Sequence, residues 1–135
     1  MGSCKNRGAN VDLFKYAINV ELLEYIYCGD MLFYKEKPFT GLRYELYPEG
    51  QLRSLTPYEN GFNNGICREW YTTGELMCEY ESKRGVNNGS KTYWHQNGLI
   101  KSIANYELGI ELDYKEWNGK GNLVKSRKFD PDNQK

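Results

Sequence analysis

The sequence lacks any apolar run long enough to cross a membrane as a helix. Such a helix needs about 18 consecutive apolar residues, and charged side chains interrupt every apolar stretch of the 135 residues. A net charge is also lacking, because 18 Lys and Arg balance 18 Asp and Glu. A chain without an excess of positive charge does not gather a polyanion, so nucleic acid is disfavoured as a partner.

Cysteine and histidine are scarce, and their spacing does not suit a metal site. None of the four cysteines, Cys4, Cys28, Cys67 and Cys78, belongs to a C-x-x-C pair or a Cys/His cluster. An enzyme should show a nucleophile with its base, paired carboxylates, a phosphate-binding loop or a metal cluster, and the sequence shows none of these. We therefore predict a non-enzymatic protein without metal or cofactor. An enzyme would require side chains distant in sequence to converge in a pocket.

Glycine and tyrosine are abundant, and the glycines recur at a fixed interval. The 14 Gly and 12 Tyr, against four Pro and three Met, favour an all-β protein with many tight turns. Matching apolar positions share the interval, with Trp94 following Trp70 and Leu76 following Leu52 after 24 residues. The three glycine series are Gly41, Gly65 and Gly89; Gly50, Gly74 and Gly98; and Gly61, Gly85 and Gly109.

Each repeat is predicted to be a β-hairpin. Residues 47–51 (YPEGQ) fit a type I turn with Pro at its second position, followed by Gly50 in the left-handed conformation. The equivalent structural turn glycines are Gly74, Gly98 and Gly121. This register pairs Leu46 with Leu52 and Trp70 with Leu76. Continued along the strands, it pairs Tyr44 with Ser54 and Arg68 with Cys78.

Alternation along the strands then assigns two faces to the sheet. We predict a structural face that carries Leu46, Leu52, Trp70, Leu76, Trp94, Ile100, Trp117 and Leu123, with Tyr58, Tyr80, Tyr106 and Phe129 nearer the strand ends. The opposite, mixed face carries Arg43, Glu45, Tyr47, Arg53, Glu69, Tyr71, Glu79, Lys91, Tyr93, His95, Lys101, Tyr114 and Glu116. The same register puts Cys67 and Cys78 on opposite faces, so we expect two free thiols.

The repeats divide the chain into an N-terminal segment, an array and a tail. We expect one extended, curved antiparallel sheet over residues 28–130, with a half unit at 28–41 and units at about 39–64, 65–88, 89–112 and 113–130. Residues 1–27 contain a possible helix capped by Asn10, with Val11, Phe14 and Ile18 on one face, and then the start of a hairpin turning at residues 29–30. Residues 131–135 form the tail.

Two segments carry a resemblance to a known repeat. Residues 39–54 (FTGLRYELYPEGQLRS) and 65–76 (GICREWYTTGEL) resemble the MORN repeat variant, in which G-x4-[WY]-Y-x-x-G-x-L recurs at this length. The resemblance extends over roughly three quarters of the chain and is shared with the bacterial YwqK family antitoxins. It implies an open array of β-hairpins used for binding. Because a repeat specifies a scaffold, the function must be argued from a site.

We predict a protein-binding module, of antitoxin or immunity type, whose partner is another protein. Tyrosines give large rigid contact areas, and neighbouring charges give polar specificity, so the partner is expected on the mixed face. The candidate partner-binding residues are Tyr47, Tyr71, Tyr93, Glu69, Arg43 and His95. His95 occupies the position of Tyr47 and Tyr71 in its own unit, which also favours a structural role for it.

The N-terminus leaves an alternative open. Met1, Gly2 and Ser3 are either an expression remnant or, with Cys4, the end of a bacterial lipoprotein signal whose apolar part is missing. The first interpretation goes with a cytoplasmic protein. The second makes Cys4 a lipid-bearing residue, through which a surface-anchored or lipid-associated scaffold would be held in the cell envelope after removal of the signal peptide.

Overall fold

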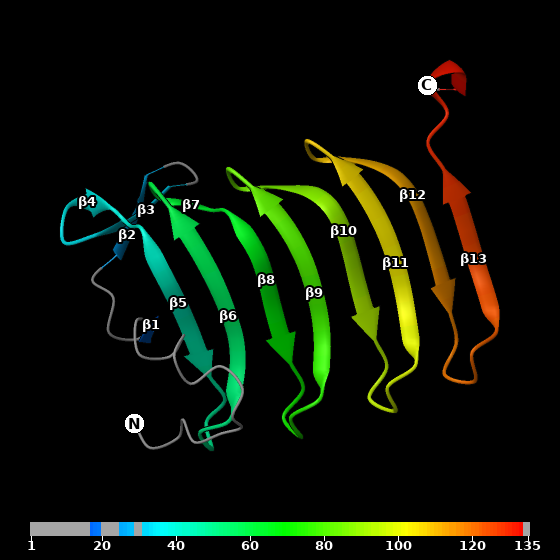
Figure 1. The fold of residues 1–135 in the computed structure, drawn as a ribbon, viewed down its shortest axis with the longest axis horizontal. Helices are drawn as coiled ribbons and strands as arrows, with labels where there is room; N and C mark the ends of the chain where they lie inside the picture. Colours follow the sequence, from blue (N-terminus) through cyan, green and yellow to red (C-terminus); the bar gives the residue numbers. More distant parts are fainter. Residues whose placement is uncertain (1–16, 20–24, 29–30, 134–135) are drawn as a thin grey trace.

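Most of the described chain folds into one long, largely antiparallel sheet, with a small second sheet near its first edge (Figure 1). The computed structural model describes residues 17–19, 25–28 and 31–133. The large sheet has the order β1-β5-β6-β8-β9-β10-β11-β12-β13, with β7 paired to β6, and a small sheet has the order β2-β3-β4. The strands are β1 (Ala17–Asn19), β2 (Tyr25–Cys28), β3 (Met31–Tyr34), β4 (Lys37–Pro38), β5 (Gly41–Leu46), β6 (Leu52–Glu59), β7 (Phe62–Asn63), β8 (Gly65–Trp70), β9 (Leu76–Lys83), β10 (Val86–Trp94), β11 (Ile100–Glu107), β12 (Ile110–Trp117) and β13 (Leu123–Lys128).

The predicted all-β class and the large antiparallel sheet are confirmed, and the helix predicted before the repeats is wrong at Ile18. This residue lies in β1, which pairs in parallel with β5 and so covers the first edge of the sheet. The rest of that predicted helix, from Asn10 to residue 16, lies outside the described residues. In the described part of the chain the one helical element is a 3-10 turn at Pro131–Asn133, and no helix there is long and apolar enough to span a membrane.

The four hairpins β5–β6, β8–β9, β10–β11 and β12–β13 have the same turn. In the first, the Tyr47 N–H donates to the carbonyl of Gln51 over 2.8 Å, and the Gly50 N–H donates to the carbonyl of Tyr47 over 2.8 Å. The glycine has a φ of 104°, in the left-handed region that favours a residue without a Cβ. The φ angles of Gly74, Gly98 and Gly121 at the other turns are 102°, 92° and 90°.

Each of these four hairpins also contains a β-bulge in its second strand, at the third residue after the turn glycine. The bulge changes the register that the sequence predicts. Trp70 pairs with Leu76 as predicted, but the next pair is Glu69 with Cys78, which leaves Met77 without a partner. A bulge puts two residues opposite one and inverts the alternation beyond it. The corresponding unpaired residues in the other hairpins are Arg53, Lys101 and Val124.

The bulge corrects several predicted positions. Tyr44 pairs with Leu55 rather than Ser54, and Arg68 pairs with Glu79 rather than Cys78. Glu79 therefore belongs to the face of the tryptophans. The three tyrosines assigned to that face instead lie on the opposite one, namely Tyr58, Tyr80 and Tyr106.

The observed register defines two faces, which we name by their aromatic residues. The tryptophan face carries Leu46, Leu52, Trp70, Leu76, Trp94, Ile100, Trp117 and Leu123 in one row across the sheet. The tyrosine face carries Cys67, Glu69, Cys78, Tyr80, Lys91, Tyr93, Ser102, Ala104, Tyr106 and Tyr114.

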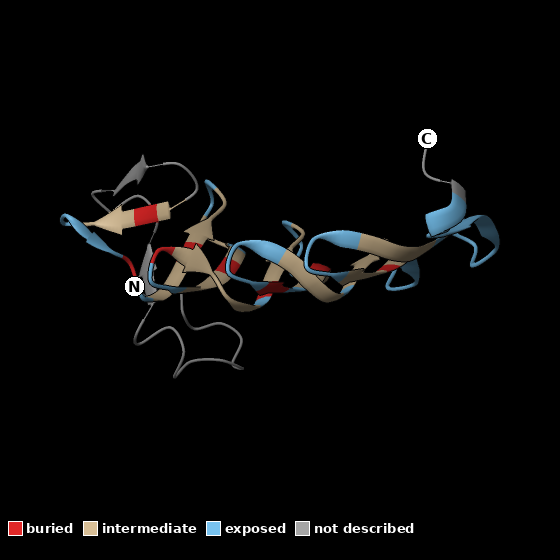
Figure 2. Ribbon diagram, turned by 90° about the horizontal axis from the view of Figure 1, so that it is seen from above, coloured by how far each residue is buried: buried red, intermediate tan, exposed pale blue. Residues whose placement is uncertain are grey.

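Buried residues are spread thinly along the layer rather than gathered in one core (Figure 2). At the N-terminal end, Leu32 and Phe39 form a small cluster against which Tyr34 and Tyr58 pack. Beyond Gly65, the buried side chains are small and lie on the tyrosine face: Cys67, Cys78, Ser82, Ser102 and Ala104. The tryptophan face is covered less than a structural face would be, because Ile100 is 38% exposed and Leu123 is 54% exposed.

Candidate binding groove on the tyrosine face

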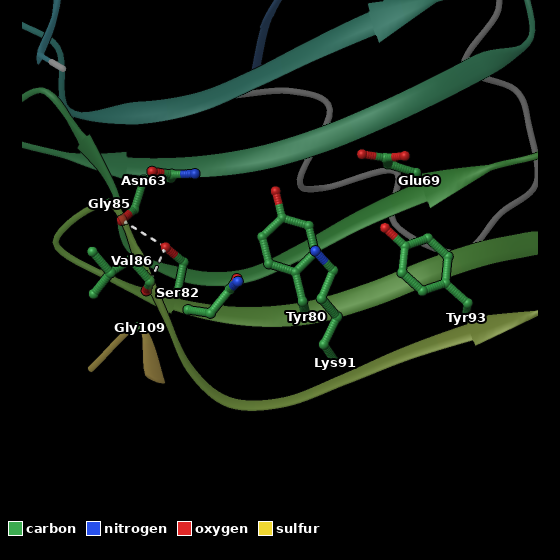
Figure 3. A pocket seen from close by; sticks show the side chains of 10 residues that line it. Asn63, Glu69, Tyr80, Ser82, Gly85, Val86, Lys91, Tyr93 and Gly109 are labelled. Carbon is green, nitrogen blue, oxygen red and sulfur yellow. Dashed lines mark hydrogen bonds between the residues drawn. The ribbon is translucent and has the colours of Figure 1, made fainter. Parts of the chain in front are cut away.

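An open groove of about 420 Å³ lies on the tyrosine face over β8, β9 and β10 (Figure 3). Its size is within the range of about 300–1,000 Å³ that is usual for small-ligand sites. The groove runs along these strands from Glu69 and Tyr93, near the hairpin turns, to the loops at Gly85 and Gly109 near the opposite end of the sheet. It is lined by Asn63, Glu69, Tyr80, Ser82, Gly85, Val86, Asn87, Lys91, Tyr93 and Gly109.

Two buried thiols lie beside the groove, next to the tyrosine rings that form its walls. Tyr80 pairs with Cys67 across β8 and β9, and Tyr93 pairs with Cys78 across β9 and β10. Each cysteine residue is only 1% exposed. Cross-strand neighbours on one face pack against each other, so a small residue beside a large ring becomes covered. The alternation of small and large side chains therefore builds this part of the sheet.

The two cysteines are free, although not for the reason predicted from the sequence. They lie on the same face, because Cys78 pairs with Glu69 and Cys67 is two residues before Glu69. Diagonal neighbours in an antiparallel pair are about 7–8 Å apart, which is beyond the usual reach of a disulfide. Burial raises the pKa of Cys78 to about 11 and also raises the pKa of Cys67. Both thiols are thus protonated near neutral pH and are poor nucleophiles.

The tyrosine hydroxyls of the groove also stay protonated. Burial, with the nearby Cys78 as the next cause, raises the pKa of Tyr93 to about 12. Burial, with the nearby Cys67, raises the pKa of Tyr80 further above its ordinary value. Protonated phenols donate hydrogen bonds and present flat apolar rings, which suits binding of a polar ligand with some apolar area.

Lys91 is the cation of the groove. Its Nζ lies 5.0 Å from the ring centroid of Tyr80 and 5.6 Å from the ring centroid of Tyr93 (Figure 3). The ion pairs in the described part of the chain are Arg43 with Glu45, Arg68 with Glu79 and Arg127 with Glu111. Neither Lys91 nor Glu69, the carboxylate of the groove, takes part in one. The groove therefore contains one positive and one negative side chain that are not paired with each other.

Hydrogen bonds within the protein shape the loop end of the groove. The Ser82 hydroxyl donates to the carbonyl of Asn63 over 3.3 Å and is 3.2 Å from the carbonyl of Val86 (Figure 3). The N–H of Gly85 donates to the same Asn63 carbonyl, and the N–H of Gly109 donates to the carbonyl of Asn87. The side-chain amides of Asn63 and Asn87 are not used by these bonds.

The structure brings two of the six predicted binding residues into the groove, Tyr93 and Glu69. Arg43 lies elsewhere on the same face and bonds to Tyr58 and Glu45. The remaining three each hold the neighbouring hairpin through a backbone carbonyl: Tyr47 to Trp70 over 2.6 Å, Tyr71 to Trp94 over 2.6 Å and His95 Nε2 to Trp117 over 3.0 Å.

Lys91 and Tyr80 were not singled out from the sequence. Alternation along the sequence puts Lys91 on the mixed face without a role, and it puts Tyr80 on the wrong face because the bulge inverts the alternation. No residue type recurs at the bulge positions, so the sequence carries no signal for this exchange of faces. In the described residues we find no group of three or more His, Cys, Asp or Glu side chains arranged to hold a metal ion. The predictions for Cys4 concern a residue outside the described ranges.

The chain is similar to an immunity protein. It is 57% identical over 96 residues to the immunity protein YwqK of Bacillus subtilis (strain 168). The aligned segment is 71% of this chain and 62% of that relative, so it spans less than two thirds of the relative's length. This supports the predicted resemblance to the YwqK group. No family model matches the chain, and no solved structure does either, so the MORN repeat assignment stays a prediction.

Proposed function

We propose that this chain is a non-enzymatic binding module of immunity type, which neutralises a toxin protein by covering it with the tyrosine face of the sheet. The observation that carries the proposal is the 57% identity to a protein named as an immunity protein. The groove adds a place for the contact. Its neutral thiols and protonated phenols offer no activated nucleophile, whereas its rings and two unpaired charges suit recognition.

The single-layer architecture supports a protein as partner. Within the described residues no layer covers the large sheet, which presents wide, nearly continuous faces. Repeat arrays generally use such extended surfaces for binding. The tyrosine face offers rigid aromatic rings at low entropic cost, with charged groups between them. A cytoplasmic location belongs to this proposal, because the chain would then meet the toxin where the toxin is made.

The test is protection in cells followed by binding in solution. A toxin candidate is the product of a neighbouring gene whose expression arrests bacterial growth. Co-expression of this chain should restore growth, and the purified proteins should form a stable complex in which the mass of the toxin is unchanged. Restored growth with a covalently altered toxin, or without a complex, would contradict a binding mechanism.

A matched pair of variants on β8 tests which face is used. Glu69→Ala changes the groove, whereas Ile66→Ala changes an exposed residue of the same strand on the tryptophan face. Because few interface residues carry most of the binding energy, Glu69→Ala should weaken the complex by up to about 2 kcal/mol. Ile66→Ala should leave the dissociation constant unchanged. The reverse result would move the interface to the tryptophan face.

A further inference from the structure

We infer that the groove on the tyrosine face receives an acidic side chain from an extended segment of the partner protein, with Lys91 as the cation that binds its carboxylate. This inference rests on the proposed function and names the chemistry of the partner at the same site. It follows from three features of the groove: an ammonium group without a carboxylate partner, walls made of aromatic rings, and a rim of unused amides.

The position of Lys91 is the first feature. Its ammonium group is held near two tyrosine rings at 5.0 and 5.6 Å, and its side chain is partly buried. Aromatic rings attract a cation, but they do not accept hydrogen bonds as a carboxylate does, so the three N–H donors still favour an anionic acceptor. The two ring contacts hold the ammonium group at the groove before a ligand arrives.

The walls of the groove favour a single carboxylate over a neutral group. Tyr80 and Tyr93 keep their protons, so neither hydroxyl adds a negative charge that would repel an anion bound at Lys91. Their rings remove water from one side of the site, and a charge pair with less water around it is stronger. Glu69 is the one carboxylate among the lining residues and repels a second acidic group at its own end of the groove. One acidic residue, rather than an acidic run, fits this arrangement.

The rim of the groove suits a peptide backbone. The main-chain carbonyls of Asn63 and Asn87 are occupied by the N–H groups of Gly85 and Gly109. Their side-chain amides line the groove and make no hydrogen bond to another described residue. A carboxamide has both donors and an acceptor, which matches the N–H and C=O groups of an extended chain. Because the groove is open along the sheet, a segment of chain can continue beyond it at either end.

The experiment uses the full chain and a phage-displayed library of short random peptides as the probe. We expect the selected peptides to share one Asp or Glu, and synthetic versions with Asn or Gln at that position to bind about tenfold more weakly. Lys91→Met keeps the aliphatic stem and should weaken the same peptides about tenfold. Lys91→Arg should retain most of the binding. Lys101→Met, at an exposed lysine of β11, is the matched control and should have no effect.

The decisive result is the double-mutant cycle between protein and peptide. If the peptide carboxylate contacts Lys91, the loss from both changes together should remain about tenfold rather than multiply to a hundredfold. Additive losses, or selected peptides without any preference for an acidic residue, would overturn the inference. If Lys91→Met fails to fold in a melting experiment, NMR shift changes in the unaltered chain decide, since an acidic peptide must perturb Tyr80, Lys91 and Tyr93 and its amide version must not.

The two proposals fail separately. If the chain protects cells from the toxin but Lys91→Met protects equally well and acidic peptides are not selected, the inference is wrong and the proposed function stands. If acidic peptides bind at Lys91 but the chain neutralises no toxin, the chemistry of the groove stands and the immunity role is wrong.

Discussion

The first turn residue of three hairpins, Tyr47, Tyr71 and His95, links its hairpin to the next one. The hydroxyl of Tyr71 donates to the carbonyl of Trp94 over 2.6 Å, and this bond joins residues 23 positions apart. The carbonyl lies at the start of a turn, where the strand ladder no longer supplies a donor. His95 takes the same place in its own unit with Nε2 as the donor. Its position in the repeat thus explains the single histidine without any chemistry.

Tyr71→Phe should lower the free energy of unfolding by about 1 kcal/mol, because the partly buried carbonyl of Trp94 loses its donor. Urea denaturation measures this loss. Tyr106→Phe is the matched control, since the Tyr106 hydroxyl makes no hydrogen bond to another described residue and its removal should be close to neutral. Equal losses for the two variants would mean that the hydroxyl of Tyr71 does not stabilise the junction.

Stability should fall at alkaline pH. Burial raises the pKa of Cys78 from an ordinary value near 9 to about 11, and that of Tyr93 to about 12. A group with a raised folded pKa contributes stability that is complete below its unfolded pKa. This stability is lost as the pH rises through the folded pKa. The urea midpoint should therefore decrease between pH 9 and 11.

Cys78→Ser isolates the contribution of the thiol. Serine occupies the equivalent positions Ser54 and Ser102, so the neighbouring hairpins show that it fits there. The variant should show a smaller decrease of the urea midpoint between pH 9 and 10 than the unaltered protein, because its hydroxyl does not titrate in this range. An unchanged pH profile would mean that other groups cause the alkaline loss.

At the scale of the hairpin, the turn glycines determine the backbone path. Gly74 has a φ of 102°, and a Cβ added there would meet nothing within 4 Å. A side chain at this position is therefore opposed by the backbone conformation and not by crowding. The left-handed conformation costs an L-residue about 1–2 kcal/mol.

Gly74→Ala should accordingly destabilise the protein by about 1 kcal/mol, as measured by urea or thermal denaturation. Gly119→Ala is the control in another turn, because a Cβ there also meets nothing within 4 Å and the φ of this glycine is not positive. That change should be neutral or slightly stabilising, since alanine reduces the freedom of the unfolded chain. Similar losses at both positions would contradict the role assigned to the Gly74 backbone.

The sequence could predict the hairpins because their signals are local. The glycine spacing and the recurring tryptophans identify the turns and the first pair beside each turn, such as Trp70 with Leu76. The bulge could not be predicted in this way, because the unpaired positions hold four different residues, Arg53, Met77, Lys101 and Val124. No shared residue type marks the bulge. Strict alternation therefore assigns the residues beyond it to the wrong face of the sheet.

The groove contains residues from both sides of the bulge, so the sequence predicts only part of the set of lining residues. Glu69 and Tyr93 lie on β8 and β10, opposite the strands that carry the extra residue, so alternation places both on one face correctly. Tyr80 lies beyond a bulge and was placed on the other face. Lys91 gains its importance from two rings on different strands, a relation that no spacing in one strand reveals.

At the scale of the whole molecule, each hairpin is stabilised by its immediate neighbours. The groove lies on β8, β9 and β10, strands that are paired on both sides. In contrast, β13 pairs with β12 alone within the described residues, and all six of its residues are exposed. The main side-chain link at this end is Arg127, which pairs with Glu111 at 2.7 Å and lies over the ring of Tyr114 at 4.0 Å.

This difference in strand pairing and burial between the central strands and β13 predicts which part of the sheet unfolds locally first. In an array that is stabilised between neighbours, the free energy of local opening is lowest where a unit has one neighbour and little buried area. Native-state hydrogen exchange should therefore show amide protons of β13 exchanging at least about tenfold faster than those of β9 and β10. Arg127→Met should accelerate exchange in β13 and leave β9 unchanged, because the lost contacts are confined to the last hairpin. Uniform exchange rates across the sheet would show that the array unfolds as one cooperative unit.

A groove held in the slowly exchanging strands would present its charged and aromatic groups to the partner in a fixed geometry, so that binding would not first have to order the site.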